Sequence, residues 1–171
     1  MPDSLYTTVV TFLRDHQGLA EPIVFVLGFA EGIPLISLFV PSSALFLAIA
    51  SLQGALGGGF WWMWLSAAGG AMLGDCATYA IGRRFKHEAQ NVWPFSRYPD
   101  WLRKGRALLE RWGWLAVLGG KFLGFLRPFV PAAAGVAEMP IPLFLLASAL
   151  SSLAWAGAFL APGFGLSLLL E

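Results

Sequence analysis

Charged residues are scarce in this chain of 171 residues. They make up 12% of it, against about 25% in an average soluble domain, whereas hydrophobic residues make up 57%. No Asp, Glu, Lys, Arg or His occurs from Ile33 to Gly74 or from Met139 to Leu170, and one spanning helix needs only about 20 apolar residues. This composition excludes an ordinary soluble domain and predicts an all-α integral membrane protein.

Cysteine and histidine are nearly absent as well. Cys76 is the only cysteine, which excludes an intramolecular disulfide and a cysteine-rich metal site. The two histidines, His16 and His87, lie in predicted surface segments, and no nucleophile with a partnered base is evident. We therefore expect no enzymatic activity, no metal, no cofactor and no nucleic-acid partner.

The N-terminus lacks the ordered features of a removable signal peptide, namely a basic start, a short apolar core and a small-residue cleavage site. None is therefore expected. Residues 1–21 instead place apolar residues such as Val9 and Phe12 at helical spacing near Arg14, which predicts an amphipathic helix lying on the membrane. Residues 22–170 contain no separate soluble segment and are predicted to form one membrane domain.

Prolines, glycines and basic residues divide this domain into five segments. Residues 60–82 and 143–162 are predicted spanning helices, whereas residues 22–56 and 112–142 are too interrupted for a plain span and are predicted re-entrant hairpins. Between them, residues 83–111 contain eight lysines and arginines against three acidic residues, and an amphipathic helix is expected around Trp101 to Arg111. By the positive-inside bias, this basic loop is predicted to be cytoplasmic.

The two predicted hairpins carry similar breakers at an offset of 90 residues. Residues 39–41 and 129–131 both read Phe-Val-Pro, and the same offset relates Glu31 to Lys121. Because one spanning helix separates the hairpins, they enter from opposite sides, which predicts a pseudo-two-fold inverted repeat. Paired interrupted segments in corresponding halves point to the central site of a transporter. The predicted helix breaks are Pro34, Pro41, Pro128 and Pro131, and the first helix of the domain is expected to stop near Glu31.

Charged residues next to these breakers are candidates for function. Lys121 and Arg127 lie in an otherwise apolar stretch, where a cation costs at least about 2.5 kcal/mol even on the mildest insertion scale. Such a cation indicates a polar cavity or a bound anion. Asp75 follows a small-xxx-small pattern over residues 70–74 that admits a close helix, and Tyr79 one turn later suggests an inward polar stripe.

In combination, these motifs resemble the DedA family, the bacterial branch of the SNARE-associated, VTT-domain membrane proteins. The match runs from about Phe29 to Gly165. The motifs that carry it are Glu31-Gly32-Ile33-Pro34, Pro41-Ser42-Ser43, Gly74-Asp75 with Tyr79 and Gly82-Arg83, and Lys121 through Arg127-Pro128-Phe129-Val130-Pro131 to Ala134-Gly135.

The resemblance implies two facing re-entrant helices that move lipids between leaflets. It implies a flippase or scramblase of the bacterial inner (plasma) membrane, multi-pass, acting on undecaprenyl phosphate or on a glycerophospholipid such as phosphatidylethanolamine. Of the family's functional polar positions, Glu31 and Arg127 match here. Ser43 replaces the second acid of the family, and Lys121 replaces the first arginine, which gives up the planar fork that grips phosphate.

The candidate transport residues are therefore Glu31, Ser42, Ser43, Asp75, Lys121 and Arg127. We expect the two cations to hold a lipid phosphate, the serines to complete the cradle, and Glu31 to neutralise the cations in the empty site. One alternative is a structural ion pair between Glu31 and Lys121. Another is a proton-coupled small-ion or solute transporter, in which Glu31 and Asp75 relay protons. A passive assembly factor is a third.

Membrane lipids are the expected partners of this protein. The small-residue pattern over residues 70–74 permits either packing within one chain or a homodimer, because it lets any neighbouring helix approach closely. Both possibilities stay open from the sequence.

Overall fold

The computed structural model describes residues 17–34, 36, 42–85, 88, 95–97 and 99–169. In this part of the chain the regular structure is helical throughout and no strand occurs, which confirms the predicted all-α class. The α-helices are α2 (Ala20–Glu31), α4 (Ser42–Ala55), α5 (Phe60–Phe85), α6 (Pro99–Trp112), α7 (Trp114–Gly120), α8 (Phe129–Val136) and α9 (Ile141–Leu169). Short 3₁₀ turns cover Gln17–Leu19, Phe95–Arg97 and Gly124–Leu126.

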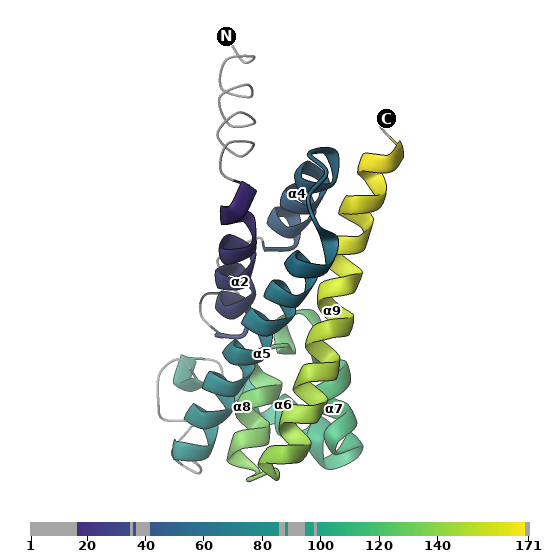
Figure 1. The fold of residues 1–171 in the computed structure, drawn as a ribbon. Coiled ribbons are helices and arrows are strands. Elements are labelled where there is room, and N and C mark those ends of the chain that lie inside the picture. Colours follow the sequence, from purple (N-terminus) through teal and green to yellow (C-terminus); the bar gives the residue numbers. More distant parts are fainter. Residues whose placement is uncertain are drawn as a thin grey trace.

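Two long helices, α5 and α9, run along the length of the molecule, and the shorter helices lie around them (Figure 1). In the figure, α2 and α4 lie toward one end, and α6, α7 and α8 toward the other. Over Ile141–Gly165, α9 is long and apolar enough to cross a membrane, and it is the one helix among the described residues that meets both criteria. The 26 residues of α5 also exceed the length of a span, but they include charged side chains.

The remaining helices of the membrane domain are short. The longest of α2, α4, α7 and α8 is α4, whose 14 residues extend about 21 Å at 1.5 Å per residue. None of these four helices can therefore cross a hydrocarbon core of about 30 Å by itself.

The four short helices pack on the two long helices in a crosswise pattern. The helix before each breaker contacts the long helix of its own half, so α2 lies on α5 and α7 lies on α9. The helix after each breaker contacts the long helix of the other half, so α4 lies on α9 and α8 lies on α5. This pattern is unchanged when the two halves of the chain are exchanged.

Glycines on α5 allow α2 to approach closely. A methyl group on Gly70 would overlap the backbone of Phe25, and one on Gly74 would overlap the backbone of Phe29 and Gly32. The close approach predicted from the small-residue pattern is therefore confirmed, and the helix that uses it is α2 of the same chain. A homodimer stays a prediction.

The buried apolar side chains form two clusters. One joins α2, α4, the first half of α5 and the second half of α9, and contains the rings of Phe46 and Trp155 with centroids 5.1 Å apart. The other joins α6, α7, α8, the second half of α5 and the start of α9, and contains Phe129 and Phe144. The charged residues described below lie where helices of both clusters meet.

Helix α6 is amphipathic, as its sequence predicts. Leu102 and Leu109 are buried against the molecule, whereas Arg103, Lys104 and Arg106 are exposed. The basic segment 83–111 is therefore not a plain loop, because α5 continues to Phe85 and α6 begins at Pro99. Its cytoplasmic side stays a prediction.

Two prolines do not interrupt helices as expected. Pro131 lies in the first turn of α8, where a missing N–H removes no helical hydrogen bond, so the helix starts there rather than breaks. Pro162 lies inside α9, which runs on to Leu169 instead of ending at residue 162. A neighbouring helix can compensate for a proline at this depth, and Gly163 packs directly on α4.

The other predicted breaks differ in outcome. Glu31 is the last residue of α2, and Pro34 lies in the turn that follows it, as predicted. Pro128 immediately precedes α8. Pro41 and most of the predicted N-terminal helix, residues 1–21, lie outside the described residues.

Candidate functional site

Two ion pairs are buried where α2, α5, α9 and the connection between α7 and α8 meet. Arg127 Nη1 contacts Glu31 Oε2, and Lys121 Nζ contacts Asp75 Oδ2. All four side chains are at most 10% exposed. Both acids come from the first half of the chain and both bases from the second, so each pair joins the two halves.

The acids are positioned by the packing of α2 on α5. Glu31 ends α2, and the next residue, Gly32, lies directly against Gly74 and Asp75. Thr78 Oγ1 donates a hydrogen bond of 2.7 Å to the carbonyl oxygen of Gly32, which fixes the end of α2 against α5. The two carboxylates are therefore placed by a single helix contact.

The bases lie on irregular backbone between α7 and α8. Lys121 caps the C-terminal end of α7, and Arg127 follows the 3₁₀ turn Gly124–Leu126. Gly124 has a φ of 53°, a left-handed conformation that glycine adopts without steric cost. Non-helical backbone inside a membrane protein is tolerated where protein or a water-filled cavity surrounds it, and both cations are buried here.

Serines of α9 complete the environment of the lysine pair. Lys121 Nζ donates to Ser152 Oγ at 2.6 Å, and Ser148 Oγ donates to Asp75 Oδ2 at 2.7 Å. Asp75 Oδ1 has no hydrogen-bond partner among the described residues. One oxygen of this carboxylate is therefore doubly engaged, and the other is left to accept a proton or a further donor.

The arginine pair is less completely satisfied. The guanidinium of Arg127 contacts Glu31 through Nη1 and lies over the ring of Trp155, with 4.0 Å from Cζ to the ring centroid. Its Nε and Nη2 are buried without a hydrogen-bond partner in the described part of the chain. Leaving a buried donor unpaired costs about 1–3 kcal/mol. Because these two nitrogens form one edge of the guanidinium fork, they can bind two oxygens of one carboxylate or phosphate.

The pairing differs from the ion pair that the repeat suggests. The 90-residue offset relates Glu31 to Lys121, but the contacts are Glu31 with Arg127 and Asp75 with Lys121. The alternative of a Glu31–Lys121 pair is therefore wrong. Residues at equivalent positions of a two-fold repeat meet only when both lie next to the axis, so an offset predicts correspondence but not contact.

The side chains of the predicted polar stripe on α5 contact two different parts of the molecule. Asp75 turns to Lys121, whereas Tyr79 OH donates to the carbonyl oxygen of Met139 at 2.5 Å and accepts from Arg83 Nη1 at 2.8 Å. The tyrosine and the arginine therefore hold the turn between α8 and α9. The predicted cradle serines 42 and 43 begin α4, but their side chains lie outside the described set.

Several residues of the site were missed from the sequence. Trp155, Ser148 and Ser152 all belong to the uncharged run that follows residue 139. Their signal is a spacing, because the polar or amphipathic residues Ser148, Ser151, Ser152 and Trp155 recur at i, i+3, i+4 and i+7. That spacing marks one face of α9, and all four residues are at most 1% exposed.

The helical fold and its buried charges together define a membrane protein with a polar centre shared by two halves of the chain. The sequence agrees with this class in detail, because the VTT-domain family model matches residues 40–164. The chain belongs to this VTT-domain (DedA) family, which confirms the resemblance seen in its motifs.

Similar proteins include three bacterial membrane proteins. Inner membrane protein YabI of Escherichia coli (strain K12) is 29% identical over 147 residues, which cover 82% of this chain and 55% of YabI. Inner membrane protein YohD of the same organism is 33% identical over 100 residues, covering 58% and 51%. An uncharacterized membrane protein of Buchnera aphidicola subsp. Acyrthosiphon pisum is 27% identical over 155 residues, covering 91% and 60%.

The chain thus spans between 51% and 60% of the length of these relatives. No solved structure matches it. The comparisons therefore establish a membrane protein of a known family, and its activity is inferred from the site.

Proposed function

We propose that this protein moves a phosphate-bearing lipid, a glycerophospholipid or undecaprenyl phosphate, between the leaflets of the bacterial inner membrane. The observation that carries the proposal is the buried, unpaired Nε–Nη2 edge of Arg127, in a protein that buries a second cation, Lys121. Two oxygens of a phosphate would satisfy this edge, while Glu31 keeps its contact with Nη1.

The energetic obstacle to lipid transfer is desolvation of the head group. A charge that leaves water for an apolar medium loses hydration worth several kcal/mol or more unless fixed polar groups replace it. The site offers such groups in Arg127, Lys121 and the hydroxyl of Ser152. Glu31 and Asp75 balance the cations when no lipid is bound, so the empty site keeps its fold.

The architecture supports a route through the protein by way of two re-entrant hairpins. The helices on either side of each breaker are too short to span, and their packing pattern is unchanged on exchange of the halves. In this proposal α2–α4 and α7–α8 enter from opposite faces of a multi-pass domain, with residues 83–111 cytoplasmic. Rocking of one half against the other would expose the charge centre to each leaflet in turn.

The test is the rate of lipid transfer in liposomes that contain a fluorescent phospholipid and the reconstituted protein. Arg127→Lys keeps the charge but removes the fork. We expect the rate to fall about 10- to 100-fold, because each charge-assisted hydrogen bond contributes about 1.5–3 kcal/mol and 1.4 kcal/mol is tenfold. Arg103→Lys, at an exposed position of α6, is the matched control and should transfer at the wild-type rate.

The two proteins are compared at equal protein content and equal thermal stability. If Arg127→Lys then transfers lipid at the wild-type rate, the guanidinium fork is not part of the mechanism. Both variants need the same size-exclusion profile before rates are compared.

A proton-coupled small-ion or solute transporter is the second candidate. It is favoured by Asp75, whose Oδ1 is buried without a described hydrogen-bond partner and whose Oδ2 lies beside Lys121. In that case Asp75→Asn would abolish proton flux in liposomes with a pH-sensitive dye, and flux would not depend on the lipid supplied. If the protein is instead a lipid transporter, Arg127→Lys lowers transport more than Asp75→Asn does, and no proton flux occurs without lipid transfer.

A further inference from the structure

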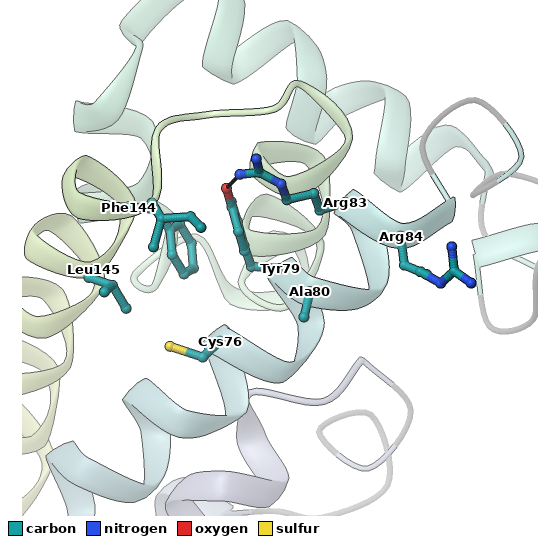
Figure 2. Close-up of a pocket in the computed structure, with 8 residues that line it drawn as sticks. Cys76, Tyr79, Ala80, Arg83, Arg84, Phe144 and Leu145 are labelled. Carbon is teal, nitrogen blue, oxygen red and sulfur yellow. Dashed lines mark hydrogen bonds between the residues drawn. The ribbon is translucent and has the colours of Figure 1, made fainter.

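A groove separate from the charge centre lies between the second half of α5 and the start of α9 (Figure 2). Its volume is about 530 Å³, within the range of about 300–1,000 Å³ that is usual for ligand pockets. The wall is mostly apolar, and its residues include Cys76, Tyr79, Ala80, Phe144 and Leu145. The groove is therefore large enough and apolar enough for a hydrocarbon chain.

One end of the groove is positively charged. Tyr79 and Phe144 stack with ring centroids 4.2 Å apart, and Arg83 donates to the hydroxyl of Tyr79 at the upper end of this stack (Figure 2). Because Tyr79 OH in turn donates to Met139, the guanidinium is held by a fixed chain of hydrogen bonds. None of the ion pairs among the described residues includes Arg83.

We propose that this groove binds an anionic phospholipid, with one acyl chain along Cys76, Phe144 and Leu145 and the phosphate at Arg83. The charge of the rim and the apolar wall complement the two parts of such a lipid. Arg83 also lies where α5 passes from its apolar length into the basic segment, which is where a head group would meet a membrane helix. The bound lipid would bridge α5 and α9, the two long helices.

This site shares no residue with the charge centre. Glu31, Asp75, Lys121 and Arg127 do not line the groove, although Asp75 directly precedes Cys76. Lipid binding at the groove therefore does not require lipid transfer. Arg127→Lys should slow lipid transfer under the proposal above and leave lipid binding at the groove unchanged. The failure of one proposal is therefore distinguishable from the failure of the other.

Native mass spectrometry of the purified protein tests the head-group contact. The protein is mixed with equal amounts of dioleoylphosphatidylglycerol and dioleoylphosphatidylcholine, and we expect it to retain the anionic lipid preferentially. Arg83→Gln should lower the retained phosphatidylglycerol about tenfold. Arg106→Gln makes the same charge change at an exposed position of α6 that does not line the groove, and it should retain the lipid.

A second pair of variants tests the acyl-chain contact without removing a hydrogen bond. Ala80 is exposed and lines the groove, so Ala80→Trp should fill it and expel the lipid while the protein folds normally. Ile81→Trp, at the next exposed position but outside the groove, is the control. Wild-type phosphatidylglycerol retention in Ala80→Trp, or equal loss in Arg83→Gln and Arg106→Gln, would overturn the proposal.

The single cysteine gives an independent readout in the wild-type protein. Cys76 is half-buried in the groove wall, and no other cysteine competes for a label. We expect phosphatidylglycerol to slow its alkylation by a maleimide more than phosphatidylcholine does. Equal rates with and without phosphatidylglycerol would contradict an acyl chain lying on Cys76.

Discussion

The short helices α4 and α8, one after the first Phe-Val-Pro motif and one that begins with the second, pack in corresponding ways but differ in burial. Every residue of α8 is buried, because α8 packs against both α5 and α6. Helix α4 packs mainly on α9 and leaves Leu45 and Leu47 about 40% exposed. The amphipathic helix α6 thus seals the second half, and no described helix covers the first half in the same way.

The charges follow the same division. The sealed half carries the bases on the connection between α7 and α8, and the more open half carries the acids on α2 and α5. Regions with fewer buried contacts open at a lower free-energy cost. We therefore expect the cations to stay fixed while the α2–α4 region moves, so that Glu31 separates from Arg127 when the site opens.

The largest expected effect comes from breaking an ion pair between the halves. Glu31→Gln leaves Arg127 buried without a counter-ion, which should lower the free energy of unfolding by about 3–5 kcal/mol. Asp75→Asn should cost less, because Lys121 keeps its bond to Ser152. Urea unfolding in detergent micelles, followed by tryptophan fluorescence, measures both.

The double variant Glu31→Arg with Arg127→Glu is the control for this prediction, since it restores opposite charges across the same contact. It should regain most of the lost stability. Unchanged stability in Glu31→Gln alone would mean that the pair does not hold the halves together.

A smaller effect on stability should distinguish the buried helix α8 from the more exposed helix α4. Ala134 on α8 is fully buried, so Ala134→Leu overpacks the core around α8 and should cost about 1–3 kcal/mol. Ala48 on α4 is exposed, and Ala48→Leu should change stability by less than about 0.5 kcal/mol. The same unfolding assay compares the two variants, and equal losses would contradict the difference in burial.

The smallest expected effect concerns a feature that the halves share. Thr78 on α5 bonds the carbonyl oxygen of Gly32 at the end of α2, and Ser151 on α9 bonds that of Leu118 in α7. Each hydroxyl ties a long helix to the short helix of its own half. Thr78→Val and Ser151→Ala should each cost about 1 kcal/mol, measured as a shift of the thermal midpoint. Clearly unequal losses would show that the two ties are not equivalent.

Much of the local structure could be predicted from the sequence. Glycines at residues 70 and 74 predict a close helix contact, the spacing of leucines and arginines predicts α6, and Glu31-Gly32 predicts the end of α2. These predictions succeed because each depends on residues within a few turns. The uncharged runs likewise identify the class of protein through composition alone.

The sequence by itself determined that the chain is helical, belongs in a membrane and must bury several charges. Only the tertiary structure decided that Glu31 meets Arg127, that Asp75 meets Lys121, and that Trp155 lies beneath the guanidinium. It also decided that α9 continues through Pro162. The reason is physical: burial cost depends on composition along the chain, whereas partners depend on how helices distant in sequence pack in three dimensions.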